Sequence, residues 1–273
     1  MFQRIMVAVV CVPIIFAVFF FCPPIALPIA ISILSMIGVH EVLWSTGFVK
    51  NLVLSVCSIL LAGLIPFWVF WGQDEFSGLV TFFVYFTAVF TTAIFSNHTV
   101  TMEKLGGSFF FATLIPYFLS SFIRLDRLDG DGKFLILTPL VAAFLSDSFA
   151  LFAGMLCGKH KLAPQLSPKK TVEGAVGGLV GATVSMILYG VVMHYRFHLE
   201  VSYPLLALYG VLGSMISQLG DLSFSYIKRQ YGLKDFGYIF PGHGGVLDRF
   251  DSVIFCAPLI EILWCLLPAM RLV

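Results

Sequence analysis

Charge is scarce in this chain of 273 residues. Only 11% of the side chains are Asp, Glu, Lys or Arg, whereas hydrophobic residues make up 59% and the mean hydropathy is +0.97. A soluble domain carries about 25% charged residues, so the composition predicts an integral membrane protein. The formal net charge is +1, and no basic face could neutralise a run of nucleic-acid phosphates. Nucleic acid is therefore excluded as a partner, and the lipid bilayer is expected.

Several motifs of known chemistry are also absent from the sequence. The six cysteines form no C-x-x-C pair, and we interpret them as small core residues. The sequence contains no G-x-S-x-G nucleophile element, no P-loop and no internal repeat. The dipeptide His40-Glu41 lacks the second histidine of a zinc-protease motif and is uninformative alone.

Long apolar runs take up most of the chain. Nine of them are long enough to cross a bilayer, which takes about 17–25 residues. They fall near residues 4–21, 25–43, 51–71, 77–96, 105–123, 134–157, 174–195, 203–222 and 251–270. The first run resembles a secretory signal, but no cleavage site stands out and we expect it to be retained. The predicted fold class is an all-α, polytopic integral membrane protein with about nine transmembrane helices.

The basic residues are distributed unevenly among the connecting loops. With the N-terminus inside, eleven of the sixteen Lys and Arg residues face the cytoplasm. We therefore expect an N-terminal transmembrane scaffold (1–132, spans 1–5) and a catalytic transmembrane region (133–273, spans 6–9). Two loops of the catalytic region, 158–174 and 223–250, would lie on the cytoplasmic side. They predict a polar cavity that faces the cytoplasm, where nucleotides are found.

We single out two carboxylates within apolar runs, because burying a charge in lipid costs at least ~2.5–3.5 kcal/mol. One is Asp147 and the other is Asp221. Each is either a structural carboxylate satisfied by neighbouring hydroxyls or bases, or part of a metal or proton site, which we favour. Asp221, Ser225 and Lys228 are spaced at i, i+4 and i+7, so one helix face would present a ligand, a hydroxyl and a cation. Arg229 would project toward another side.

A polar stretch, residues 225–251, contains the turn Pro241-Gly-His-Gly-Gly. Its glycines allow tight backbone geometry and leave amides exposed for anionic oxygens. We expect a helix to begin near Val246, with Asp248 and Asp251 on one face. Carboxylates there suit a helix N-terminus electrostatically, and they equally suit Mg²⁺, which prefers one or two carboxylates with phosphate oxygens and waters.

The other cytoplasmic loop reads GKHKLAPQLSPKKTVEG (158–174). Its Ser167-Pro168 pair predicts a helix start, with a hydroxyl cap followed by proline. The lysines of this loop are either a positive-inside anchor or a polyphosphate cradle at the helix N-terminus, and we favour the cradle. The residues assigned to that cradle are Lys169, Lys170, Thr171 and Glu173.

The stretch SYIKRQYGLKDFGYIFPGHGGVLDRFD (225–251) closely resembles the C-terminal pattern of the CDP-diacylglycerol synthase (phosphatidate cytidylyltransferase) family. That pattern runs S-x-apolar-K-R, four residues, K-D, then H-G-G-apolar-x-D-R-apolar-D. Its fixed positions are filled by Ser225, Lys228, Arg229, Lys234, Asp235, His243, Gly244, Gly245, Asp248, Arg249 and Asp251. The run SPKKTVEG (167–174), Asp147 and the pair Gly220-Asp221 are also similar, so the detailed resemblance covers roughly residues 140–260.

The resemblance implies a membrane nucleotidyltransferase that condenses CTP with phosphatidate, giving CDP-diacylglycerol and pyrophosphate with Mg²⁺ as cofactor. The short chain is similar to the bacterial members, which implies a bacterial cytoplasmic membrane and a site facing the cytoplasm. The oligomeric state stays open, with a homodimer as one option. The metal ligands expected are Asp221 and Asp248, supported by Asp251 and Asp147.

The remaining expected roles concern phosphates and substrates. Lipid or leaving-group phosphates would be bound by Lys228, Arg229 and Arg249, with His243 orienting a phosphate. The other expected substrate-binding residues are Ser167, Lys169, Lys170, Thr171, Glu173, Ser225, Lys234, Gly244 and Gly245.

Two alternative functions are weighed against this expectation. A transporter for a phosphorylated lipid would need charges and broken helices at the bilayer midplane, whereas the charges here cluster at the inner face. A CDP-alcohol phosphotransferase predicts a D-G-x-x-A-R helix, which the sequence lacks.

Overall fold

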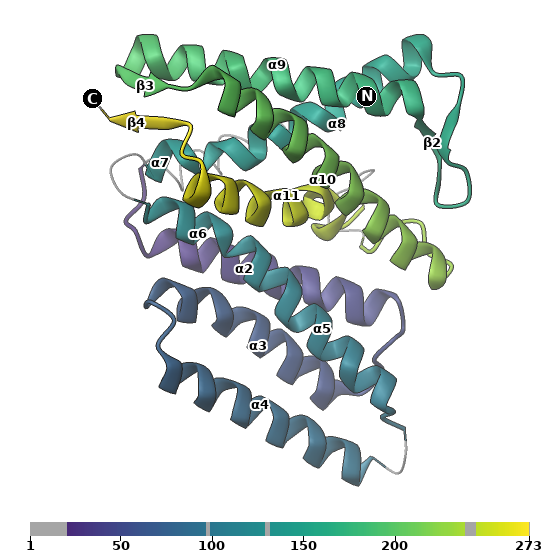
Figure 1. The fold of residues 1–273 in the computed structure, drawn as a ribbon. Coiled ribbons are helices and arrows are strands. Elements are labelled where there is room, and N and C mark those ends of the chain that lie inside the picture. Colours follow the sequence, from purple (N-terminus) through teal and green to yellow (C-terminus); the bar gives the residue numbers. More distant parts are fainter. Residues whose placement is uncertain (1–20, 97–98, 129–131, 238–243, 273) are drawn as a thin grey trace. The chain divides into compact units, whose positions relative to one another are not determined.

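The computed structural model describes residues 21–96, 99–128, 132–237 and 244–272, and it is mostly helical (Figure 1). The helices are α2 (Ala26–His40), the π-helix η1 (Glu41–Ser45), α3 (Leu52–Phe70), α4 (Glu75–Phe95), α5 (Met102–Leu119), α6 (Ser121–Asp126), α7 (Gly132–Leu135), α8 (Leu137–Cys157), α9 (Val172–Phe197), α10 (Tyr203–Gln230) and α11 (Leu247–Leu266). Four short strands form two antiparallel pairs: β1 (Lys161–Ala163) with β2 (Ser167–Thr171), and β3 (Leu199–Val201) with β4 (Met270–Leu272).

Seven stretches of the described chain are long and apolar enough to cross a membrane. They are Ala26–Ser45, Leu52–Phe70, Glu75–Phe95, Met102–Asp126, Lys133–Cys157, Val172–Phe197 and Tyr203–Gln230. They match the second to eighth predicted spans, while the first (4–21) lies almost wholly outside the described residues. The ninth forms α11, which is not among the seven because charged residues recur along it. An integral membrane protein rich in spanning helices is thus supported, whereas the count of nine and the cytoplasmic cavity stay predictions.

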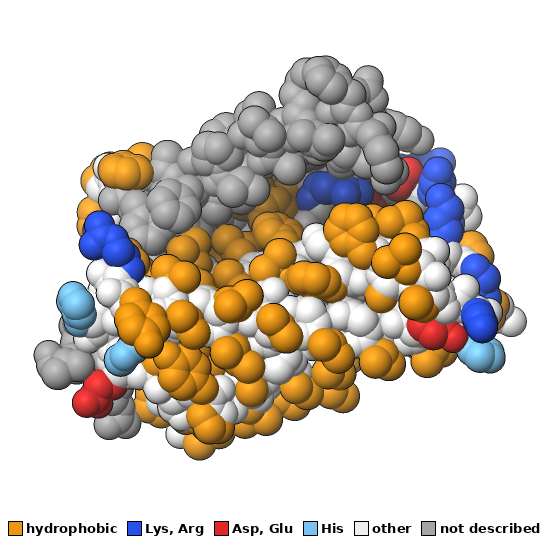
Figure 2. Space-filling model, turned by 90° about the horizontal axis from the view of Figure 1, so that it is seen from above, with side chains coloured by type: hydrophobic (Ala, Val, Ile, Leu, Met, Phe, Trp, Pro, Cys, Tyr) orange, Lys and Arg blue, Asp and Glu red, His pale blue; other side chains and the backbone are white. Residues whose placement is uncertain are grey.

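The exposed face of α9 shows how these helices meet lipid. Val176, Val180, Val184, Leu188 and Val192 recur every fourth residue, and each is about half exposed. In Figure 2, hydrophobic side chains fill the middle of the face in view, whereas Lys, Arg, acidic and His side chains gather at its two ends. An apolar band between charged rims is the pattern that a bilayer requires.

Contacts divide the chain into two compact units. Unit 1 comprises residues 1–124 and 231–249, and unit 2 comprises residues 125–230 and 250–273. The boundary therefore falls within the first turn of α11. The division predicted at residue 132 was a functional one, and it stays a prediction.

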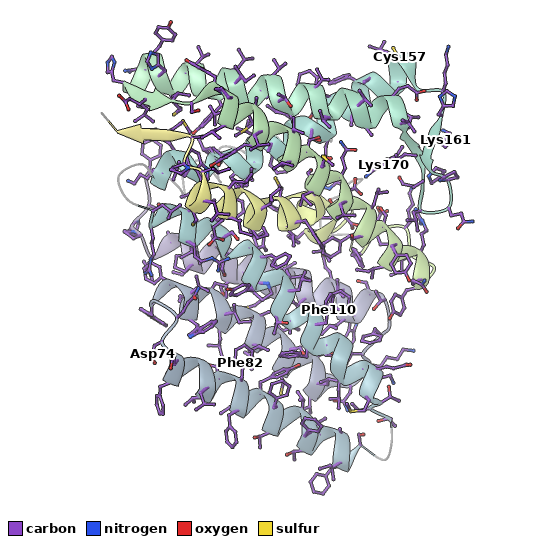
Figure 3. All side chains as sticks on the ribbon, viewed as in Figure 1. Asp74, Phe82, Phe110, Cys157, Lys161 and Lys170 are labelled. Atoms are coloured by element: carbon purple, nitrogen blue, oxygen red, sulfur yellow. The ribbon has the colours of Figure 1, made fainter. Side chains whose placement is uncertain are left out.

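Unit 1 is built on α3, which packs against α2, α4 and α5. Helices α3, α4 and α5 begin where the sequence supplies polar caps. Asn51 Oδ1 accepts a hydrogen bond from the Leu54 amide at the start of α3. Asp74, labelled in Figure 3, accepts one from the Ser77 amide at the start of α4. These caps fix the ends of helices whose apolar sequences alone would not define a start.

Unit 2 is built on α8, α9 and α10, which pack against one another. Small residues on α9 bring its backbone close to α8. A Cβ atom added at Gly178 would lie 2.8 Å from the Ser146 carbonyl oxygen and 3.0 Å from the Ala150 Cβ atom. Inside this contact, the Ser146 and Ser214 hydroxyls hydrogen-bond at 2.7 Å, joining α8 to α10. Close helix packing therefore sets where polar groups on α8 and α10 meet.

The predicted helix start at Ser167-Pro168 was wrong. Residues 167–171 form strand β2, which pairs antiparallel with β1, and α9 begins only at Val172. Thr171 is the actual cap, because its Oγ1 atom accepts a hydrogen bond from the Gly174 amide at 3.0 Å. Pairing with the preceding strand outweighs the local Ser-Pro signal. By contrast, the predicted start of the last helix near Val246 is confirmed by α11, which begins at Leu247.

We expect Gly178→Ala to destabilise the protein by about 1–3 kcal/mol, because the added methyl group meets a backbone carbonyl. The matched control is Gly106→Ala in α5, where a Cβ atom meets nothing within 4 Å. There, alanine should be neutral or stabilising by up to about 1 kcal/mol. Thermal unfolding in detergent measures both, and equal melting temperatures for the two variants would contradict the packing described.

Candidate active site

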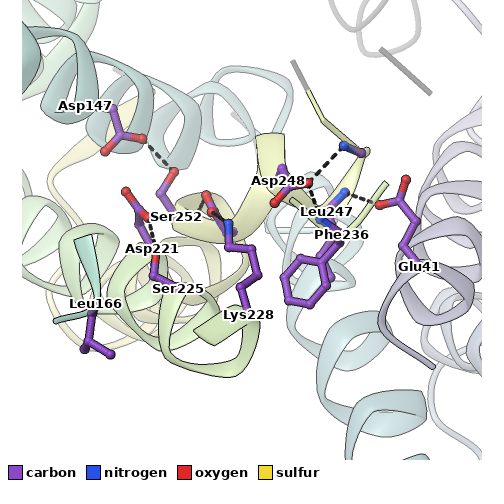
Figure 4. Close-up of polar contacts among 12 residues, drawn as sticks. Glu41, Asp147, Leu166, Asp221, Ser225, Lys228, Phe236, Leu247, Asp248 and Ser252 are labelled. Carbon is purple, nitrogen blue, oxygen red and sulfur yellow. Dashed lines mark hydrogen bonds and ion pairs between the residues drawn. The ribbon is translucent and has the colours of Figure 1, made fainter. Parts of the chain in front are cut away.

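Three carboxylates from three helices interact in unit 2, and we call them the acidic cluster: Asp147 on α8, Asp221 on α10 and Asp251 on α11. Figure 4 labels Asp147 and Asp221. Asp251 is only 7% exposed. Its carboxylate is repelled by the charges of Asp221 and Asp147 and attracted by that of Lys228. The structure therefore brings together three of the four predicted metal ligands.

Two lysines balance the acidic cluster. The Lys170 Nζ atom lies 2.5 Å from Asp221 Oδ2, and the Lys228 Nζ atom lies 3.9 Å from Asp251 Oδ2. Lys228 is itself only 7% exposed. A buried charge is strongly unfavourable unless it is paired, and these two lysines supply the partners of Asp221 and Asp251.

Two serine hydroxyls orient the carboxylates further. Ser225 Oγ donates to Asp221 Oδ1 at 3.3 Å, one helical turn along α10. Ser252 Oγ donates to Asp147 Oδ2 at 2.9 Å and so links α11 to α8. The predicted shared face of Asp221, Ser225 and Lys228 is thus borne out for the first two by a direct contact, and Lys228 is buried on the same helix.

The β1–β2 hairpin is held against the end of α10. Arg229 Nε donates to the Leu166 carbonyl oxygen at 3.1 Å, and Lys170 reaches Asp221 from strand β2. Figure 3 shows Lys161 and Lys170 on this hairpin. The neighbouring Lys169 is exposed, and Ser167 is half-buried at the start of β2. The hairpin, rather than a helix N-terminus, therefore carries the predicted cradle lysines.

Glu173, another predicted cradle residue, shapes the chain just before the hairpin. Its carboxylate accepts hydrogen bonds from the Lys159 and His160 amides and lies 2.6 Å from His160 Nδ1. Thr171 serves as the helix cap described above. Both residues have structural partners, and their predicted contacts with substrate stay predictions.

The remaining predicted residues belong to the segment 231–249 of unit 1. Asp248 Oδ2 accepts hydrogen bonds from the Phe236 amide at 2.7 Å and the Gly245 amide at 2.9 Å. Gly244 has a φ of +81°, a conformation that favours glycine. Lys234 and Arg249 are exposed, and His243 lies outside the described residues. The predicted pairing of Asp248 with Asp221 stays a prediction.

The chemistry of the acidic cluster fits a hard divalent cation. Its groups are carboxylate and hydroxyl oxygens, the ligands that Mg²⁺ prefers. Among the described residues, no three His, Cys, Asp or Glu side chains are placed to hold a metal ion together. The Lys170 ammonium group instead takes a cation's place beside Asp221. The ligand types therefore suit Mg²⁺, whereas the counter-charge beside Asp221 in this structure is the Lys170 ammonium group.

One buried acid was missed by the sequence reasoning. Glu41, at the end of α2, is 3% exposed, and its carboxylate accepts hydrogen bonds from the Val246 and Leu247 amides. The available signal was the one used for Asp147, a carboxylate at the edge of an apolar run.

Comparison with known proteins identifies the family of this chain. The Cytidylyltransferase family matches residues 2–267. The phosphatidate cytidylyltransferase of Bacillus subtilis is 36% identical over 214 residues, which cover 76% of this chain and 78% of that protein. Those of Staphylococcus saprophyticus and Thermotoga maritima are 43% and 34% identical, over 55% and 56% of this chain and 56% of each relative. The match extends over both units, and the chain belongs to the Cytidylyltransferase family.

Proposed function

We propose that the acidic cluster is the catalytic centre of a phosphatidate cytidylyltransferase. A phosphate oxygen of phosphatidate attacks the α-phosphorus of CTP. The bond from that phosphorus to the oxygen bridging to the β-phosphate breaks, so CDP-diacylglycerol forms and pyrophosphate leaves. The observation that carries the proposal is the convergence of three carboxylates and two lysines from separate elements of unit 2. The names of the relatives in the same family support the substrates.

The acidic cluster would hold Mg²⁺ through Asp221 and Asp251, with Asp147 beside them. When bound, the ion would neutralise charge on the phosphates. Phosphatidate is already anionic, so the protein's task is to bring two polyanions together and to stabilise the leaving pyrophosphate. Lys228 supplies a positive charge beside Asp251, and the Ser225 hydroxyl fixes the rotamer of Asp221.

Lys170 is suited to bind the triphosphate of CTP. It lies on strand β2 of the β1–β2 hairpin, and its ammonium group already lies beside Asp221. On substrate binding, Lys170 would exchange the Asp221 carboxylate for phosphate oxygens. Arg229, which we expected to bind phosphate, supports the hairpin through the Leu166 carbonyl oxygen and so places Lys170.

The residues of the 231–249 segment complete the proposed site. Asp248 would supply a further metal ligand. The expected phosphate contacts come from Lys234, His243, Gly244, Gly245 and Arg249. The bias of basic residues toward one set of loops supports a site that faces the cytoplasm of a bacterial inner membrane.

The first test is the reaction itself. Purified protein, radiolabelled CTP, phosphatidate in mixed micelles and Mg²⁺ should yield a labelled CDP-lipid and an equal amount of pyrophosphate. Chelation of Mg²⁺ with EDTA should stop both, and added Mg²⁺ should restore them. Uptake of a phosphorylated lipid without either product would instead favour the transporter.

Neutralising the acidic cluster should stop turnover. Asp221→Asn and Asp251→Asn should each lower kcat at least about 100-fold, because each keeps the side-chain shape but removes a charge that balances cations and phosphates. Glu200→Gln is the matched control in the same unit, since Glu200 is exposed on β3. Should Asp221→Asn retain a near wild-type rate at saturating Mg²⁺, Asp221 is not a metal ligand.

Replacing Lys170 should separate nucleotide binding from metal binding. Lys170→Gln should raise the KM for CTP roughly 10–100-fold through the loss of charge-assisted hydrogen bonds. It should also lower the Mg²⁺ concentration at half-maximal rate, because the ammonium group no longer competes for Asp221. Lys161→Gln, on β1 of the same hairpin, is the control. An unchanged KM in Lys170→Gln contradicts the assigned role.

A further inference from the structure

We infer that Glu41 is a positioning residue for cytidylyl transfer, because it holds the backbone that carries Asp248. The inference rests on the proposed function, in which Asp248 is a metal ligand. Glu41 is the first residue of η1, directly after α2. It lies over 200 residues from Val246 in sequence, but both belong to unit 1. Nothing in the C-terminal family pattern points to it.

The Glu41 carboxylate caps the N-terminus of α11. Its Oε1 atom accepts a hydrogen bond from the Val246 amide at 2.9 Å. Its Oε2 atom accepts one from the Leu247 amide at 2.8 Å (Figure 4). The first amides of a helix have no partner within the helix, and a residue next to the start normally supplies one. Here the cap comes from a different helix, so the place where α11 begins depends on Glu41.

Asp248 completes this arrangement from the other side. Its Oδ2 atom accepts from the Gly245 amide, while Glu41 accepts from the next two amides, those of Val246 and Leu247. Three consecutive amides thus donate to two carboxylates. Such a run of amides is a strong anion-binding backbone. If Glu41 did not occupy two of them, the Asp248 side chain could be drawn to the vacated amides and its orientation would no longer be fixed.

The backbone around Glu41 is shaped to admit its carboxylate. A Cβ atom added at Gly245 would overlap the Glu41 carboxylate. One added at Gly237 would overlap the same carboxylate and lie 3.0 Å from the Gly245 Cα atom. Alanine at either position would therefore collide with the carboxylate. Glu41 also opens the π-helix η1, and π-turns occur frequently at functional sites. Glu41 is therefore buried in a space that exists only because residues 237 and 245 are glycines.

The test is Glu41→Gln, which keeps the shape but turns one acceptor oxygen into an NH₂ group facing an amide donor. We expect at least about a tenfold loss of kcat, equal to about 1.4 kcal/mol, with less than about a threefold change in the KM for CTP. The reason is that CTP is held by Lys170 of unit 2, whereas Asp248 loses its orientation. Glu103→Gln, at the exposed start of α5 in unit 1, is the matched control and should behave as wild type.

Hydrogen exchange separates this inference from the proposed function. Amides 245–247 should exchange at least about tenfold faster in Glu41→Gln than in wild type, a result that does not depend on which reaction the protein catalyses. If the wild type shows no cytidylyltransferase activity but exchange rises as expected, the proposed function fails and the contact stands. Unchanged exchange, or a wild-type kcat in Glu41→Gln, overturns the inference.

If Glu41→Gln does not fold, a second variant, Glu41→Asp, tests the same inference. Glu41→Asp keeps the charge but withdraws the carboxylate by one methylene group. It should give a monodisperse protein with the same loss of kcat and of amide protection. A fully active Glu41→Asp would show that the position of the carboxylate does not matter, and the inference would be wrong.

Discussion

The structure depends on holding like charges together in a poorly solvated place. The buried carboxylate of Asp251 is repelled by the charges of Asp221 and Asp147. Lys170 and Lys228 offset that repulsion, and Ser225 and Ser252 fix two of the carboxylates. The close packing of α8, α9 and α10 keeps these groups within reach of one another. Such a cluster, stable only with added positive charge, is suited to bind a cation together with phosphates.

In the segment that leads into α11, carboxylates hold the backbone in place instead of forming a charge cluster. Glu41 and Asp248 use their carboxylates on backbone amides rather than on lysines. Amide donors stabilise a carboxylate and fix its direction at the same time. Asp251 therefore belongs to the acidic cluster of unit 2, whereas Glu41 and Asp248 fix the backbone that leads into α11 in unit 1.

Local patterns in the sequence predicted much of the candidate site. Helical periodicity relates Asp221 to Ser225, a contact between residues close in sequence. The cost of charge in lipid singles out Asp147, but not its partner Ser252, which lies 105 residues along the chain. Lys170 was recognised, but its surroundings were wrong, because the Ser167-Pro168 signal competes with pairing to a strand that periodicity does not reveal. Glu41 was missed because its partners lie far along the chain. Contacts of that kind follow from the packing of helices, which the hydropathy pattern does not specify.

The same distinction applies to the fold. Apolar length predicted seven of the spanning helices, because a span must satisfy its own backbone hydrogen bonds in lipid. The helix α11 was also predicted, and charged residues recur along it. Its first turn joins the two units, and the family match covers both.

The claim that the acidic cluster is the metal site is tested most directly by locating the metal. Fe²⁺ substituted for Mg²⁺ generates hydroxyl radicals on addition of ascorbate and peroxide, and these cleave the backbone next to the ion. We expect cleavage near residues 147, 221 and 251, suppressed by excess Mg²⁺ and lost in Asp221→Asn. Cleavage confined to other parts of the chain, such as the 124–133 loop, would contradict the account.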